Sequence, residues 1–144
     1  MVLGGSKQWF SVPVNLLLAL SGASTFASTQ TLPPQAAYAV FEAETMTMKR
    51  VFDGTWTYCI SIEGEDPSAY LFSRLQLLYE HIVPKSQCTG DANGAIDIKH
   101  IETINEDLIK VAFDCYAFCK YETTYTLQLA SGNWLIQRAR HRMQ

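Results

Sequence analysis

The chain has 144 residues, of which 48% are hydrophobic, and it carries a formal net charge of −3. This length suits one domain with a modest hydrophobic core. The mildly acidic charge argues against nucleic acid as the natural partner, because surfaces that bind nucleic acid are normally basic.

Residues 1–27 are predicted to be a secretory signal peptide. Lys7 is their only charged residue, an apolar stretch follows it, and Thr25 and Ala27 supply small side chains ahead of a cut before Ser28. The apolar stretch is too short to span a bilayer. The alternative is an uncleaved N-terminal anchor. The signal-peptide prediction implies a secreted or periplasmic protein that has no membrane attachment after cleavage.

Residues 28–34 are rich in Ser, Thr, Gln and Pro and are expected to form a flexible leader. A single α+β domain is expected over residues 35–144. Its first helix is predicted at residues 35–52, because apolar side chains recur on one side at helical spacing. These side chains are Ala37, Val40, Phe41, Met48, Val51 and Phe52. Gly54 suits the left-handed conformation that ends many helices.

A short strand is predicted at residues 56–62, where apolar and polar residues alternate. A second helix is predicted from Pro67 to about Val83, with Asp66 as its N-terminal cap and Pro67 in its first turn. One apolar stripe runs along this helix: Leu71, Leu75, Leu78 and Ile82. Pro84 is expected to stop the helix.

The last third of the chain predicts an antiparallel meander. Period-two alternation marks strands at residues 96–104, 108–115 and 121–129 and from residue 134 onward. A bulge is expected at residues 99–100, because Ile98 and Ile101 otherwise lie on opposite faces. The predicted fold class is therefore α+β: two main helices packed on a curved antiparallel sheet and stabilised by disulfides.

The four cysteines are Cys59, Cys88, Cys115 and Cys119, and all follow the predicted signal peptide. An even number outside the cytoplasm argues for disulfides. On one continuous strand Cys115 and Cys119 would lie about 13 Å apart, whereas a disulfide requires a Cα–Cα distance of about 4.4–6.8 Å. A turn at residues 116–118 is needed in any case, since the strand would otherwise be unusually long. The expected pairs are therefore Cys115–Cys119, across a hairpin loop, and Cys59–Cys88.

Several of these residues carry a resemblance to a group of small exported bacterial proteins of unknown function. The first half of that group resembles Cys59, residues 66–68, Leu71, Leu75 and residues 84–88. Its second half has a cysteine pair in a hairpin loop, an aromatic-rich strand and a final Gly-x-Trp strand. These features resemble Cys115, Cys119, residues 121–129 and residues 132–134. The resemblance brings no established activity.

The order of helix, helix and meander also resembles the NTF2-like or cystatin-like superfold. Such folds host enzymes, ligand binders and interaction modules, so the fold does not select a function.

Few residues suggest chemistry, and no cofactor or metal site is predicted. His81 and His100 could meet at one end of a cavity and form an acid–base pair with Glu102 or Asp114. The alternative is a strand histidine beside the core and a surface histidine on the helix. A redox role for the Cys115–Cys119 pair is disfavoured, because its spacing differs from that of thioredoxin-like motifs.

Two further groups of residues have a structural and a functional interpretation. Trp56, Tyr121, Tyr125 and Trp134 could line an apolar ligand pocket, or they could belong to the core. Arg138, Arg140, His141 and Arg142 are interpreted as a solvated strand end in preference to a phosphate site.

The sequence leaves three hypotheses for the function. The first is an exported non-enzymatic module that holds a small apolar ligand or a protein partner at the concave sheet face. The second is an NTF2-like enzyme that uses a histidine–carboxylate pair. The third is an inhibitor or immunity-type protein, which requires an exposed aromatic or arginine anchor on a loop.

Overall fold

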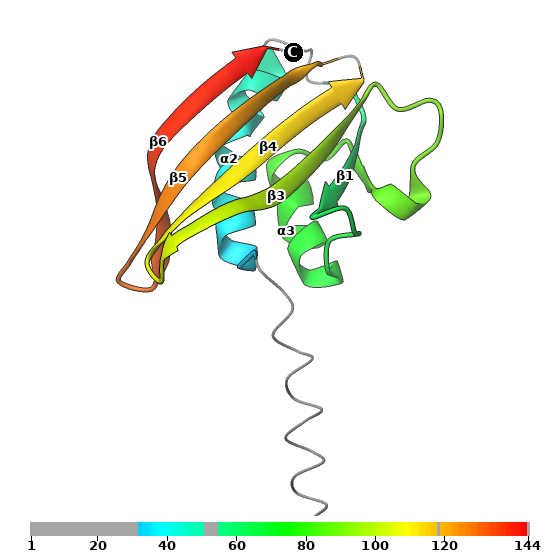
Figure 1. Ribbon diagram of the computed structural model, residues 1–144. Helices are drawn as coiled ribbons and strands as arrows, with labels where there is room; N and C mark the ends of the chain where they lie inside the picture. The colour runs from blue at the N-terminus through cyan, green and yellow to red at the C-terminus, as the bar shows by residue number, and fades with distance from the viewer. Residues whose placement is uncertain (1–31, 51–54, 118, 144) are drawn as a thin grey trace, which may run out of the picture. The chain divides into compact units, whose positions relative to one another are not determined.

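The computed structural model describes residues 32–50, 55–117 and 119–143, all within one compact unit, Leu32–Gln144. The elements in chain order are α2 (Pro34–Arg50), β1 (Tyr58–Ile62), α3 (Ala69–Leu78), β2 (Ile82–Pro84), the short 3₁₀ helix η3 (Lys85–Gln87), β3 (Gly94–Asn105), β4 (Leu108–Ala117), β5 (Tyr121–Ala130) and β6 (Asn133–Met143). The fold of these residues is α+β, with α2 and α3 on one side of an open sheet (Figure 1). No helix among them is both long enough and apolar enough to pass through a membrane.

Among the residues that the structure describes, the sheet has six strands in the order β2-β1-β3-β4-β5-β6. Strands β3 to β6 form the predicted antiparallel meander. Strand β1, however, runs parallel to both β2 and β3, so the sheet is mixed and the expectation of a purely antiparallel sheet was wrong. The reason is the connection: the chain leaves β1, passes through α3 and returns in the same direction, and a crossover of this kind produces parallel neighbours.

Helix α3 is shorter than predicted, because it ends at Leu78 and not at Val83. Tyr79 has an extended backbone, and Ile82 pairs with Tyr58 in strand β2. Val83 precedes a proline, a position that disfavours helical backbone, and β-branched residues favour strands. The chain therefore leaves the helix before Pro84 can stop it.

The N-terminal cap of α3 also differs from the prediction. The Ser68 hydroxyl, and not Asp66, accepts a hydrogen bond from the Leu71 amide at 3.2 Å. Asp66 instead accepts hydrogen bonds from the Ser86 amide and hydroxyl, at 2.8 and 2.5 Å. Asp66 thus ties the loop after β1 to η3.

Helix α2 begins at Pro34, one residue before the predicted start, and proline is well suited to the first helical position. Leu32, which was expected in the flexible leader, is 1% exposed and belongs to the core. The predicted cap at Gly54 lies outside the described residues, as do the predicted signal peptide and residues 28–31.

The period-two alternation gives the meander one buried and one wetter face. The buried face contributes Ile96, Ile98, Ile109, Val111, Phe113, Tyr121, Tyr125 and Leu127 to the core. Helix α2 covers this face with Val40, Phe41 and Met48, and the rings of Phe41 and Phe113 lie 6.5 Å apart. Strand β3 is irregular one residue later than predicted: Lys99 and His100 pair regularly, the register shifts between His100 and Glu102, and Ile101 is 47% exposed.

Both cysteine pairs lie at disulfide distance, in the pairing that the sequence predicted. The Cα atoms of Cys59 and Cys88 are 5.5 Å apart and those of Cys115 and Cys119 are 5.6 Å apart. Cys59 is on β1 and Cys88 follows η3, so this disulfide ties two segments that are 29 residues apart. The second disulfide joins β4 to its connection with β5, over only 4 residues.

These loop lengths predict unequal contributions to stability. In the chain-entropy account, Cys59→Ser/Cys88→Ser should lower the free energy of unfolding by about 3–4 kcal/mol, and Cys115→Ser/Cys119→Ser by about 2 kcal/mol. Urea denaturation of the two double variants checks this order, and each variant is the control for the other. A larger loss of stability in Cys115→Ser/Cys119→Ser than in Cys59→Ser/Cys88→Ser would contradict this order.

Candidate functional site

The two candidate histidines lie at different places in the sheet. The His81 carbonyl accepts a hydrogen bond from the Tyr58 amide, at the end of β1 that pairs with Gly94. His100 follows Ile98, the last residue of β3 that pairs with β1. Six residues of extended strand separate Gly94 from His100, a distance of about 20 Å. The structure therefore does not bring the two histidines together.

Neither histidine is buried against a carboxylate. His81 is partly exposed, and its Nε2 atom lies 3.9 Å from a Glu80 carboxylate whose side chain is 82% exposed. The Nε2 atom of His100 lies 2.7 Å from the Thr103 hydroxyl. Both histidines thus occupy partly solvated positions.

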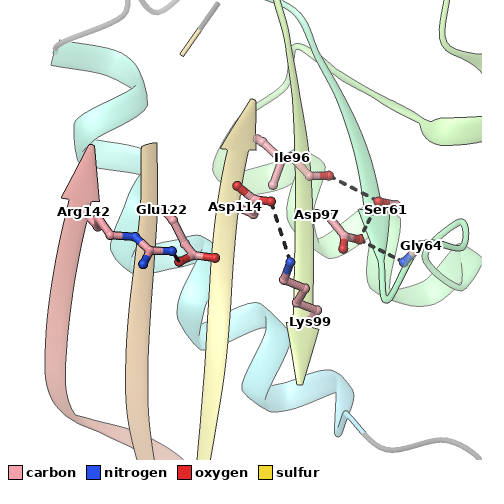
Figure 2. Close-up of polar contacts among 8 residues, drawn as sticks. All are labelled: Ser61, Gly64, Ile96, Asp97, Lys99, Asp114, Glu122 and Arg142. Atoms are coloured by element: carbon pink, nitrogen blue, oxygen red, sulfur yellow. Dashed lines mark hydrogen bonds and ion pairs between the residues drawn. The ribbon is translucent and has the colours of Figure 1, made fainter. Parts of the chain in front are cut away.

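The two candidate carboxylates interact with lysines on the outer face of the sheet, the face opposite the helices. Asp114 lies 3.7 Å from the Lys99 ammonium (Figure 2), and Glu102 lies 3.7 Å from the Lys110 ammonium. His100 pairs with the buried Val111 and so belongs to the helix-facing side. The predicted acid–base group is therefore divided between the two faces. In the part of the chain that the structure describes, no cluster of His, Cys, Asp or Glu could hold a metal ion.

The four aromatic residues that were predicted to line one pocket occupy three places. The Trp56 ring lies 6.3 Å from that of Tyr58, and its carbonyl accepts a hydrogen bond from Tyr79. Tyr121 and Tyr125 are buried under α2. Trp134 is the second residue of strand β6, is half-buried, and lines a surface cleft.

Glu44 is a buried carboxylate that the sequence analysis missed. It lies on α2, is 1% exposed, and accepts hydrogen bonds from Tyr121 at 2.8 Å and from Tyr125 at 2.5 Å, one on each oxygen. A signal was present, because Glu44 stands on the same helical stripe as Val40, Phe41 and Met48. A charged residue inside an apolar stripe needs polar partners in the core.

The environment of this cluster is closed. Tyr121 and Tyr125 are each 4% exposed. Burial, and then the neighbouring Glu44 carboxylate, raises the pKa of both phenols above the ordinary tyrosine value of 10.0. Since a ligand has no access to these atoms, we interpret the cluster as a polar clamp that holds α2 on the sheet.

A surface cleft of about 350 Å³ lies where α2, α3 and the start of β6 meet. It is lined by Pro34, Gln35, Tyr38, Ala39, Glu42, Tyr70, Leu71, Arg74, Asn133 and Trp134. We call this the aromatic cleft, after its three aromatic residues. Tyr38 and Glu42 stand one turn apart on α2, and Tyr70 and Arg74 stand one turn apart on α3, so each helix contributes one ring and one charge.

Arg74 organises the aromatic cleft. Its guanidinium carbon lies 4.4 Å from the centre of the Tyr38 ring and 5.9 Å from that of Tyr70. Stacking of this kind is favourable, because the face of an aromatic ring is electron-rich. Hydrogen bonding to Tyr70 and then to Tyr38 raises the pKa of Arg74 further. The cleft therefore presents aromatic surface with a permanently charged donor held between two rings.

A scan against protein-family models, a search of curated proteins and a search of solved structures found no match for this chain.

The polar clamp predicts a loss of stability at alkaline pH. Above a pH of about 10, tyrosines of the unfolded chain lose their protons while Tyr121 and Tyr125 keep theirs. The folded state then binds more protons than the unfolded state, so the free energy of unfolding falls as the pH rises.

Tyr125→Phe should weaken this pH dependence and lower the free energy of unfolding by about 1–3 kcal/mol at neutral pH. Urea denaturation between about pH 8 and about pH 11 measures both effects. The exposed Tyr70→Phe is the control, and equal pH dependence in the two variants would refute the clamp.

Proposed function

We propose that this protein is an exported, non-enzymatic binding module that captures a protein partner in the aromatic cleft. The observation that carries the proposal is the arrangement of Arg74 between Tyr38 and Tyr70 at the surface. Tyr70 is 70% exposed, although it is a large aromatic side chain. Tyrosine, tryptophan and arginine are the residue types most enriched among the energetic anchors of protein interfaces.

The shape of the aromatic cleft supports a protein partner over a small molecule. Its volume of about 350 Å³ is near the lower limit for ligand pockets. Charges from Glu42 and Arg74 stand beside the aromatic surface, as in the polar rim of a protein interface. Because Tyr70 is mostly exposed, its ring cannot form the wall of a closed ligand pocket. The ring is instead accessible to the surface of a protein partner.

The concave sheet face, where the sequence placed the ligand, is filled by the helices. Ile96, Ile98 and Phe113 on that face are each 0% exposed. The proposed binding site therefore lies at the edge of the helical layer, where Trp134 is partly accessible to solvent. The enzymatic hypothesis gains no support from geometry, because the histidines and carboxylates are apart.

Export is part of the same proposal. The two disulfides are compatible with an extracellular location, and the predicted signal peptide is the other support. The sequence patterns that resemble small exported bacterial proteins and NTF2-like or cystatin-like folds are compatible with an interaction module, which is one of several functions that such folds host. An inhibitor or immunity-type role is a narrower form of this function, but the exposed anchor Tyr70 lies on helix α3 and not on a loop.

The proposal predicts where a partner contacts the chain. A photo-crosslinking amino acid in place of Tyr70 should form a covalent adduct with one discrete protein in cells that export the chain. Leu77 is the matched control position, because it is on the same helix and is 87% exposed but lies outside the aromatic cleft. In the variant that carries the crosslinking amino acid at position 70, the further substitution Trp134→Ala should weaken partner binding by about 30-fold, the effect of removing an interface anchor. Equal crosslinking from both positions, or an adduct that persists after Trp134→Ala, would contradict the proposal.

A further inference from the structure

The outer face of the sheet carries a second surface, built around three arginines of β6. Arg138, Arg140 and Arg142 are alternate residues of one strand, so their side chains share a face and are spaced by about 6.6 Å. All three are exposed. We call them the arginine row.

The neighbours of the arginine row differ along its length. Arg142 donates a hydrogen bond to Glu122 at 2.9 Å (Figure 2). Arg138 pairs across the strands with Thr126, and Arg140 with Thr124. These two arginines thus face short hydroxyl side chains where Arg142 faces an acid.

A hollow of about 290 Å³ accompanies this pattern. Besides the arginine row it is lined by Lys110, Glu122, Thr124 and Thr126. Lys110 pairs with Thr126 on the side away from Arg138, so Thr126 lies between a cationic side chain of β4 and one of β6, whereas the β4 neighbour of Thr124 is Ala112. A hollow with hydroxyl donors on its floor and cations on both sides suits a carboxylate.

Strand β6 is also the edge of the sheet. It spans 11 residues and, within the described ranges, pairs with another strand on one side only. The other side of an edge strand offers main-chain N–H and C=O groups to an added strand. An added strand projects every second side chain over the same face, at the spacing of the arginine row.

Charge disfavours a second copy of the chain that pairs with this edge in a register centred on the arginine row. If a second copy paired antiparallel about Arg140, Arg138 would stand opposite Arg142 and Arg140 opposite itself. Like charges directly opposite each other destabilise a strand pair. A strand with acidic residues at alternate positions places a carboxylate at each arginine instead.

We propose that the edge of β6 and the adjoining hollow bind an extended acidic segment of a partner protein, which adds to the sheet as a further strand. Arg138 and Arg140 bind the carboxylates of that segment, and the outward main-chain groups of β6 hold its backbone along the strand. This surface lies on the side of the sheet opposite the helices and does not depend on the aromatic cleft.

The test uses a capped synthetic peptide that alternates Glu with Thr, added to the nitrogen-15-labelled protein. NMR should show shifts of the β6 amides, and Arg138→Gln/Arg140→Gln should weaken binding by about tenfold or more, as expected for removing complementary charge. Lys49→Gln/Arg50→Gln at the exposed end of α2 removes the same charge and should leave the Kd unchanged.

A second peptide of the same composition, with its glutamates consecutive, separates strand addition from general attraction of anions. We expect it to bind at least about tenfold more weakly, because its carboxylates do not match the period of the strand. Three outcomes would overturn the proposal. They are equal affinity for the two peptides, displacement of the alternating peptide by polyphosphate as effectively as by the unlabelled peptide itself, and an equal loss of affinity in the two double variants.

Discussion

The hydrogen bonds from Tyr121 and Tyr125 to Glu44 are the constraint on which the arrangement of the helical layer depends. They are buried, they use both carboxylate oxygens, and they join α2 to β5. A buried carboxylate deprived of such donors is costly, so rotation or sliding of α2 over the sheet would be strongly unfavourable. The apolar contact between Phe41 and Phe113 holds the same helix, but apolar contacts tolerate small rotations that directional hydrogen bonds do not.

The fixed rotation of α2 determines what the protein presents to solvent. With Glu44 directed at the sheet, Tyr38 and Glu42 occupy the flank of the helix, where α3 brings Tyr70 and Arg74 beside them. The interior clamp thus determines the geometry of the aromatic cleft. On the other side of the sheet, the strand alternation that buries one face leaves charged side chains on the opposite face. The molecule therefore has one aromatic surface on its helical side and one cationic surface on its outer face.

Local patterns predicted much of this fold, whereas long-range choices were beyond them. Alternation located the meander, and the Cα distance required for a disulfide gave both cysteine pairs, because each depends on spacing within the chain. The parallel direction of β1 and the strand at Ile82 depend on pairing with Tyr58, which no local pattern encodes. The aromatic cleft was missed for the same reason: Trp134 was identified as a candidate, but its neighbour Arg74 is 60 residues away in the sequence. The burial of Glu44, in contrast, has a local signal, because this residue interrupts the apolar stripe of α2.

The central claim, that Glu44 receives both tyrosine hydroxyls inside the fold, can be tested directly by proton NMR. Hydroxyl protons that are buried and hydrogen-bonded exchange slowly enough with water to be observed. For Tyr121 and for Tyr125 the structure predicts such a resonance, each with a nuclear Overhauser effect to the side-chain methylene protons of Glu44, which the buried Tyr79 hydroxyl, bound to the Trp56 carbonyl, does not share. Rapid exchange of both hydroxyls, or Overhauser effects to residues other than Glu44, would contradict the clamp and the helix rotation derived from it.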